Sequence, residues 1–222
     1  MKNLLLFLSL FANDNIHQTN TYDLQINFLD SLVYEKAPKG IRDSFNSSII
    51  IYSINMDEVS SGSANLIDFE GQEVFLTAEH VITNSLFLYG VEKNGNKIGL
   101  EIIFKDPEKD IAILKPIDKT TVTKSVKFKH SKKDKIGSNV YHCGHPIGIS
   151  FNVSEGIITS IKDRAYVINS FSLPGSSGSV VFDEDGNVIG VLLSIAVYNE
   201  QAITNIVLVT PIDDKYISQS LK

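Results

Sequence analysis

The sequence contains a single cysteine, Cys143, among its 222 residues. No disulfide can form within the chain, so its stability must come from packing. No run of about eighteen apolar residues is present, which argues against a full-length membrane-spanning helix. An excess of basic residues is also lacking, since the net charge is −6. The composition therefore gives no support for a nucleic-acid partner.

The composition that is present is that of an ordinary soluble globular protein, with 43% hydrophobic and 21% charged residues. A chain of this length suits one domain, or two small lobes that share a core. We divide it into an apolar N-terminal segment (1–12), a polar lead-in (13–46) with a helical stretch near 22–34, and one domain (47–222).

The N-terminal segment 1–12 has two interpretations. Lys2 followed by the apolar run LLLFLSLFA resembles a short signal peptide, which predicts export to the periplasm or the cell exterior. Its end is a poor cleavage site, because Leu10 and Ala12 stand where two small residues are typical. The alternative is an apolar segment that packs on the domain.

Short β-branched and apolar runs dominate the domain, and clusters of Gly, Asn, Asp and Ser separate them. This pattern is typical of an all-β sandwich or pair of barrels. Acidic residues after Pro211 predict a short C-terminal helix. The predicted strands are 49–54, 64–67, 73–78, 86–91, 99–104 and 111–114, then 139–141, 153–161, 165–168, 179–182, 188–193 and 206–209.

Three local patterns carry residues suited to catalysis. His80 follows the apolar run 74–76, so a strand end can present its ring to a cleft. Asp110 precedes the apolar run 111–114, where a shielded carboxylate can hold one histidine nitrogen and fix its tautomer. Glycines flank Ser176 and Ser177, which permits a tight turn with inward-pointing N–H groups.

Each of these patterns alone is more often structural than catalytic. A Gly-Ser-Ser-Gly-Ser segment, for example, looks most like a flexible loop. Their joint occurrence in the order His80, Asp110, Ser177 within an all-β chain is more specific. It is the order of the chymotrypsin-type double-barrel proteases, and it differs from that of subtilisins and α/β-hydrolases.

From residue 61 to the C-terminus the chain resembles the trypsin-like protease domain of HtrA-type serine proteases. The segments that carry the resemblance are 62–68 (GSANLID), 75–81 (FLTAEHV), 106–115 (DPEKDIAILK), 144–148 (GHPIG), 154–160 (SEGIITS), 174–178 (PGSSG), 185–191 (DGNVIGV) and 211–214 (PIDD). The resemblance implies two antiparallel six-stranded β-barrels of the chymotrypsin fold with a short C-terminal helix. The active site would lie between the barrels.

By the same resemblance, Ser177 is the nucleophile, His80 the general base and Asp110 the acid that orients it. Backbone N–H groups of Gly175 and Ser177 would form the oxyanion hole, with Ser176 as a further contributor. The activity implied is serine endopeptidase, acting on a protein or peptide substrate through an acyl-enzyme. No metal or organic cofactor is required for this chemistry.

The sequence departs from the HtrA pattern in three respects. Ser176 replaces the asparagine of that pattern and the aspartate of digestive proteases, which argues against activation by a freed N-terminus. Ser179 replaces a glycine, and the resulting Gly-Ser-Ser-Gly-Ser motif also occurs in glutamyl endopeptidases and some virus-encoded relatives. The 222 residues leave no room for a PDZ domain. The N-terminal contacts of HtrA trimers are not recognisable, so no oligomeric state is predicted.

The primary specificity pocket is expected, by resemblance, to involve the segments around Phe171, Ser172, Leu193 and Ser194. Neither segment contains an acidic residue, which argues against a preference for Lys or Arg. The second segment also lacks the histidine that many Glu- or Gln-preferring relatives use. A small or medium aliphatic residue before the scissile bond is the expectation that follows.

Other polar residues offer weaker alternatives. His142, Cys143 and His145 lack a clear fourth ligand for a metal site. Cys143 as a nucleophile lacks flanking glycines and a nearby acid, and it is better interpreted as a buried small hydrophobe. The six lysines of 124–135 are better interpreted as a solvated loop between the barrels than as a nucleic-acid site.

Two alternatives remain for the function. A protease-like domain can lack activity and serve as a latent peptide-binding module, although all three triad residue types are in place here. The enzyme can equally be a processing protease of a virus or mobile element, or a housekeeping quality-control enzyme.

Overall fold

The structure is a computed structural model that describes residues 36–221, except 57, 147–148, 163–164 and 199–200. The predicted N-terminal segment (1–12) and the helical stretch near 22–34 lie outside the described residues. Residues Pro38–Lys222 form one compact unit. No helix in the described part of the chain is long and apolar enough to cross a membrane.

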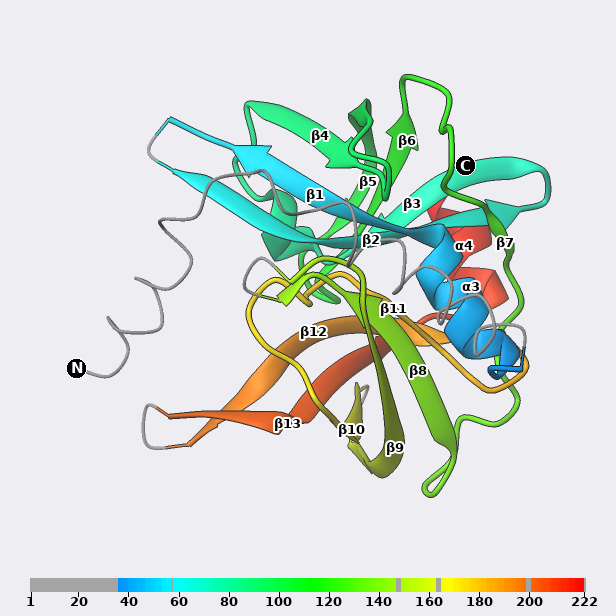
Figure 1. Cartoon of the computed structure of the whole chain (residues 1–222). Helices are drawn as coiled ribbons and strands as arrows, with labels where there is room; N and C mark the ends of the chain where they lie inside the picture. Colours follow the sequence, from blue (N-terminus) through cyan, green and yellow to red (C-terminus); the bar gives the residue numbers. More distant parts are fainter. Residues whose placement is uncertain (1–35, 57, 147–148, 163–164, 199–200, 222) are drawn as a thin grey trace, which may run out of the picture. The chain divides into compact units, whose positions relative to one another are not determined.

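The first half of this unit is a closed six-stranded antiparallel barrel (Figure 1). Strand β1 pairs with both β4 and β2, and these two pairings close the barrel. Its strands are β1 (Ser48–Ile54), β2 (Val59–Phe69), β3 (Gln72–Thr77), β4 (Phe87–Val91), β5 (Lys97–Asp106) and β6 (Ile111–Pro116). A two-residue strand, β7 (Val126–Lys127), joins β2 in parallel and is an addition that the sequence analysis did not predict.

The second half forms another closed six-stranded barrel, in the order β10-β13-β12-β11-β8-β9. Its strands are β8 (Asn139–Gly144), β9 (Asn152–Lys162), β10 (Ala165–Ser170), β11 (Val180–Phe182), β12 (Val188–Tyr198) and β13 (Gln201–Pro211). The prediction of two antiparallel six-stranded barrels is therefore confirmed. Strands β12 and β13 extend several residues beyond the predicted apolar runs, because they also form a long hairpin with each other.

Three helical segments accompany the barrels in the part of the chain that the structure describes. The helix α3 (Lys39–Ser47) lies against β8 and β11, the short 3-10 helix η1 (Glu79–Ile82) follows β3, and α4 (Asp214–Ser220) ends the chain. The predicted C-terminal helix is confirmed, but it starts later than expected. Pro211 ends β13, and the side chain of Asp213 caps the helix by accepting a hydrogen bond of 2.7 Å from the N–H of Tyr216.

The cores of the two barrels meet at their interface. Strands such as β3 and β6 are apolar along most of their length because both of their faces are covered. One cluster of buried side chains runs from Phe75 and Leu114 in the first barrel to Phe182 and Val191 in the second. A second cluster fills the interior of the second barrel around Ile158 and Val207. The loop that carries Ser177 thus lies between the two packed barrels.

Candidate active site

His80 and Asp110 lie close together in the first barrel, on η1 and on the turn between β5 and β6. The two residues share two hydrogen bonds: the backbone N–H of His80 donates to Asp110 Oδ1 at 2.8 Å, and His80 Nδ1 lies 2.7 Å from Asp110 Oδ2. A carboxylate can only accept, so Nδ1 carries the proton and Nε2 presents a lone pair. The ring is therefore held through Nδ1, and 47% of the His80 side chain is exposed.

The turn that presents Asp110 is shaped by polar contacts on both sides. Asp110 itself has a φ of 55°, a left-handed conformation that Asp tolerates better than most residues. Before it, Asp106 Oδ1 accepts a bond of 3.0 Å from Lys109 N, and Thr210 Oγ1 of β13 donates to the Lys109 carbonyl at 3.1 Å. The Asp110 side chain keeps 27% exposure, so the carboxylate is only partly shielded from water.

Ser177 lies on the loop between β10 and β11, in the second barrel. Its hydroxyl donates to the carbonyl of Leu193 at 2.7 Å. Within the described part of the chain, no hydrogen bond joins this hydroxyl to His80. Such a contact is often long or absent in a protease without its substrate, and rotation about one side-chain bond redirects the hydroxyl.

The loop before Ser177 is a tight turn. Ser176 N–H donates to the Leu173 carbonyl at 3.0 Å. Pro174 and Gly175 occupy the two central positions, and the φ of Gly175 is +102°. Proline followed by a glycine with positive φ is the signature of a type II turn. A Cβ on Gly175 would lie 2.5 Å from the carbonyl oxygen of His145, so only glycine fits there.

This turn decides which backbone N–H groups remain available. Those of Gly175 and Ser177 have no acceptor among the described residues. The N–H of Ser176 is taken by Leu173, and the side chain of Ser176 is buried against Gly144. In this conformation the Ser176 donor is used within the turn, and a contribution of Ser176 to an oxyanion hole stays a prediction.

The loop that carries Ser177 is hydrogen-bonded to the first barrel through Ser63. Ser63 donates its backbone N–H to the Ser177 carbonyl and its hydroxyl to the Gly175 carbonyl, both at 2.8 Å. Thr77, three residues before His80, donates to the carbonyl of Ser63 at 2.7 Å. A chain of contacts thus links the His80 segment to the Ser177 loop.

The four residues predicted to line the specificity pocket differ in orientation. Phe171 is 51% exposed and Ser194 is exposed, whereas Ser172 is 1% exposed. Leu193 contributes its carbonyl to Ser177, while its side chain lines a different cavity. Of the four, only Ser172 is buried.

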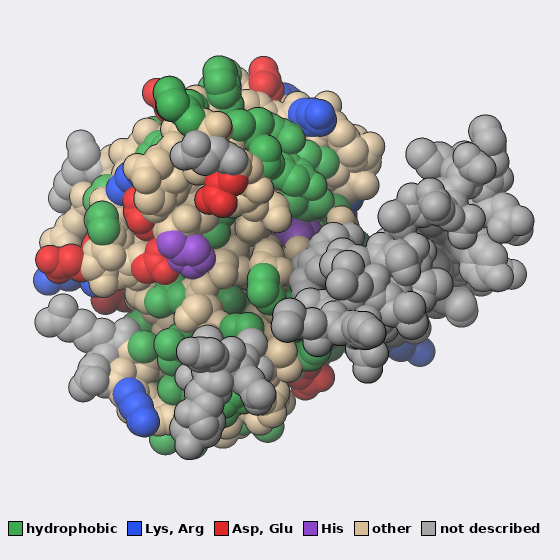
Figure 2. Space-filling model, turned by 90° about the vertical axis from the view of Figure 1, so that its left-hand side faces the viewer, with side chains coloured by type: hydrophobic (Ala, Val, Ile, Leu, Met, Phe, Trp, Pro, Cys, Tyr) green, Lys and Arg blue, Asp and Glu red, His purple; other side chains and the backbone are tan. Residues whose placement is uncertain are grey.

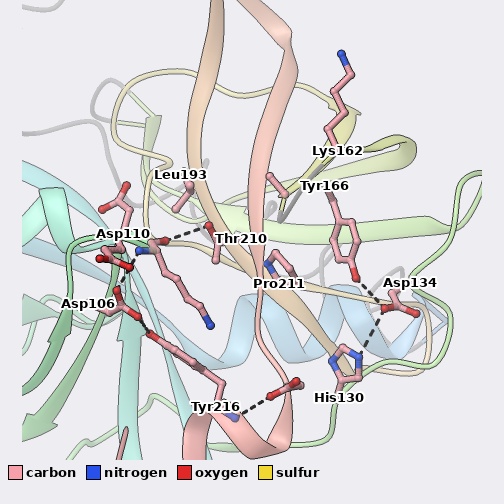
Figure 3. Close-up of a pocket in the computed structure, with 14 residues that line it drawn as sticks. Asp106, Asp110, His130, Asp134, Lys162, Tyr166, Leu193, Thr210, Pro211 and Tyr216 are labelled. Carbon is pink, nitrogen blue, oxygen red and sulfur yellow. Dashed lines mark hydrogen bonds and ion pairs between the residues drawn. The ribbon is translucent and has the colours of Figure 1, made fainter.

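The cavity that Leu193 lines has a volume of about 870 Å³, and Asp110 lines it together with residues of β13 and α4 (Figure 3). Most of its lining residues have polar or charged side chains. Tyr216 donates to Asp106 at 2.9 Å, and Tyr166 donates to Asp134 at 2.7 Å. The sequence analysis did not anticipate this cavity, because its lining comes from both barrels and from α4.

One face of the molecule carries exposed apolar side chains. Figure 2 shows hydrophobic side chains gathered on this face, with histidine and acidic side chains among them. Exposed apolar residues follow His80 closely in the chain, with Leu86 at 56% and Phe87 at 70% exposure. Such an apolar surface suits an extended peptide.

The residues considered for a metal site have separate partners. His145 Nε2 lies 3.0 Å from Ser48 Oγ, and its Nδ1 accepts from the Phe151 N–H at 2.8 Å. Burial lowers the pKa of His145 to about 4 and raises that of the Cys143 thiol to about 12. In the segments that the structure describes, no three His, Cys, Asp or Glu side chains are placed to hold a metal ion.

Comparison with known proteins places this geometry in a family. Residues 41–191 match the model of the trypsin-like peptidase domain. A probable periplasmic serine endoprotease, DegP-like, from Bartonella henselae is 28% identical over 162 residues, which cover 69% of this chain and 32% of that protein. The serine protease Do-like HtrA of Lactobacillus helveticus is 31% identical over 133 residues, or 54% of this chain and 32% of that protein. The chain thus spans about a third of the length of these relatives.

Solved structures show the same fold. The HtrA-type protease AlgW with a tripeptide superposes with a TM-score of 0.71 at 22% identity, covering 82% of this chain and 62% of that one. A Mycobacterium tuberculosis protease in its active form gives 0.68 at 19% identity, covering 83% and 86%.

Proposed function

The chain belongs to the trypsin-like peptidase domain family and is related to the HtrA serine proteases, and we propose that it is a serine endopeptidase with His80, Asp110 and Ser177 as its triad. The observation that carries the proposal is the pair of hydrogen bonds between His80 and Asp110, at 2.8 and 2.7 Å. They leave His80 Nε2 as the free base, on the segment that is tied to the Ser177 loop through Ser63.

The proposed reaction is acyl transfer from a peptide to Ser177. The serine hydroxyl turns from the Leu193 carbonyl to His80 Nε2, and Oγ attacks the scissile carbonyl as Nε2 takes the proton. The negative oxygen that develops is bound by the N–H groups of Gly175 and Ser177. The imidazolium then gives its proton to the leaving amine. Water enters, loses a proton to His80 and releases the acid.

Asp110 has a positioning and electrostatic role in this scheme. Its carboxylate holds Nδ1–H and stabilises the imidazolium that forms when Nε2 is protonated, without itself taking the proton. The additional bond from the His80 backbone N–H fixes the carboxylate relative to the ring. The substrate is a protein or peptide chain.

A latent peptide-binding module is the second candidate. The observation that favours it is the hydrogen bond from Ser177 Oγ to Leu193 O, which directs the hydroxyl away from His80. In such a module the Ser177 hydroxyl would stay bound to Leu193 O, and the cleft would hold peptides without cleaving them.

A fluorophosphonate probe separates the two candidates without knowledge of the substrate. The active enzyme is labelled covalently at Ser177, and labelling is lost in Ser177→Ala and in His80→Ala. Folded wild-type protein that resists the probe would support the latent module. Labelling that persists in Ser177→Ala would refute the assignment of the nucleophile.

Export through residues 1–12 is a further part of the proposal. It is supported by the apolar run and by the word periplasmic in the names of several relatives. Fractionation of expressing bacteria, with sequencing of the mature N-terminus, tests it. An intact Met1 in cytoplasmic protein would contradict it.

A further inference from the structure

Two buried polar atoms in the second barrel have no hydrogen-bond partner in the described part of the chain. They are His142 Nδ1 and Ser172 Oγ, and each residue is only 1% exposed. Leaving a polar atom buried and unpaired costs free energy, so such atoms are rare in folded proteins. An exception calls for a physical reason, and a ligand that supplies the missing partner is one.

Both residues belong to segments that contact the proposed catalytic loop or lead into it. Along β8, side chains alternate between the inside and outside of the barrel, and Val140, His142 and Gly144 share the inward face. Gly144 packs against Ser176, which precedes Ser177. His142 is therefore one side-chain layer deeper in the barrel than that contact.

Ser172 reaches the same end of the barrel from another strand. It lies between the end of β10 at Ser170 and the turn that begins at Leu173. Its backbone N–H donates to the Thr204 carbonyl at 2.8 Å, which holds the segment against β13. The segment that leads into the catalytic turn thus contributes one of the two unpaired atoms.

The orientation of the His142 ring follows from its neighbours. Ser170 Oγ donates its proton to the Glu155 carbonyl at 3.1 Å, so it accepts from His142 Nε2, 3.0 Å away. The hydrogen is then on Nε2, and Nδ1 has a free lone pair. Burial lowers the pKa of His142 to about 4, so the ring is neutral at physiological pH.

We propose that His142 and Ser172 form the polar floor of the primary specificity pocket and bind the side-chain amide of glutamine or asparagine immediately before the scissile bond. The amide N–H donates to His142 Nδ1, and the Ser172 hydroxyl donates to the amide oxygen. A carboxamide supplies both partners at once without bringing a charge into the barrel. The proposal rests on the proposed endopeptidase function.

Other side chains fit this floor less well. A lysine or arginine would be buried without a carboxylate, and a glutamate would face the lone pair of a neutral imidazole. An aliphatic residue, which the sequence analysis expected, would leave both polar atoms unpaired after water is excluded. That expectation considered the segments around Ser172 and Leu193, whereas His142 comes from a third strand.

Peptides that differ only in the residue before the scissile bond test the proposal. Glutamine and methionine form a matched pair of similar length. We expect wild-type kcat/KM to favour glutamine by about tenfold or more, and we expect His142→Leu and Ser172→Ala each to reduce that ratio severalfold. Thr123→Val is the matched control, because Thr123 Oγ1 is also buried and unpaired but lies outside the second barrel. A ratio near one in wild type, or an unchanged ratio in both variants, would overturn the proposal and leave a buried water as the occupant.

A binding measurement separates this proposal from the proposed function. Ser177→Ala cannot form an acyl-enzyme, but its pocket is intact. We expect a glutamine peptide, and not its methionine counterpart, to shift the ¹⁵N resonance of His142 Nδ1. This shift together with absent fluorophosphonate labelling in wild type would contradict the endopeptidase alone. Labelling of wild type without a shift would contradict the polar floor alone.

Discussion

Asn65 Oδ1 accepts a hydrogen bond of 2.8 Å from the backbone N–H of Val180, three residues beyond Ser177. Asn65 lies on β2 in the first barrel and Val180 begins β11 in the second, so the bond crosses between the barrels. The amide of Asn65 donates to Ser44 O at 2.9 Å and to Ser47 Oγ at 2.8 Å, which adds α3 to the same junction. One fully buried side chain therefore fixes three elements around the loop that carries Ser177.

Removal of this junction should destabilise the protein. Asn65→Ala leaves the Val180 N–H and the Ser44 carbonyl buried without partners, and we expect a loss of about 3 kcal/mol in the free energy of unfolding. Urea denaturation followed by circular dichroism measures it. Asn169→Ala, at an exposed position of β10, is the control and should change stability little. Equal effects of the two substitutions would show that Asn65 is not a structural junction.

Asp110→Asn should abolish most activity while preserving the fold. The amide can donate to Nδ1 and so favours the wrong tautomer of His80, which lowers the rate of acylation by about 10⁴-fold. The rate of fluorophosphonate labelling measures the effect. Asp118→Asn is a suitable control, because Asp118 also accepts a backbone N–H, from Gly99 at 3.0 Å, without contacting His80. Labelling of Asp110→Asn at the wild-type rate would remove Asp110 from the triad.

Gly175→Ala tests whether the turn before Ser177 builds the oxyanion hole. The substitution introduces strain at a φ of +102° and places Cβ 2.5 Å from the His145 carbonyl oxygen, so the turn must change. We expect fluorophosphonate labelling to fall at least 10²-fold as one donor is displaced. Gly95→Ala is the matched control, because Gly95 also has a positive φ, +82°, but nothing lies within 4 Å of an added Cβ. It should cost about 1 kcal/mol of stability and leave labelling intact. Equal labelling of the two variants would argue against a role for Gly175.

The sequence predicted the barrel architecture because the relevant signals are local. Each short apolar run between turn residues became a strand, and the order of the strands followed the family resemblance. The contact between His80 and Asp110 was predictable for the same reason, since each residue lies next to a strong strand signal and the resemblance pairs them.

Features that depend on contacts between distant segments were not predictable from local patterns. The hydrogen bond from Ser177 Oγ to Leu193 O, and the use of the Ser176 N–H by Leu173, depend on the conformation of a loop. The inward orientation of His142 depends on the register of β8 in the closed barrel. In the sequence, His142 was visible only as a member of an incomplete metal motif.

Glu92 should make stability depend on pH in the acid range. Its buried carboxylate accepts hydrogen bonds from Thr121, Thr123 and Asn96, among others. Burial acts to raise its pKa, but these bonds outweigh burial and lower the pKa from 4.5 to about 2. Because the folded pKa lies below the unfolded value, the stabilisation is complete above about pH 4.5 and is lost as pH falls towards 2.

The measurement compares wild type with Glu92→Gln by urea denaturation between pH 7 and the lowest pH at which both fold. We expect a stability difference on the order of 3 kcal/mol at pH 7 that shrinks below pH 4.5. Glu101→Gln, at an exposed position of β5, should show no such dependence. A difference that stays constant with pH would show that ionised Glu92 is not the stabilising species.

Cys143 should be chemically inert in the folded protein. Its side chain is fully buried, and burial raises the pKa of the thiol to about 12, so the reactive thiolate is scarce at neutral pH. We expect iodoacetamide at pH 8 to leave native protein unmodified by mass spectrometry, and to alkylate it fully in urea. Fluorophosphonate labelling after the native treatment should equal that of untreated protein. Rapid alkylation of the folded protein with loss of labelling would instead make Cys143 part of the active site, and the serine mechanism would then need revision.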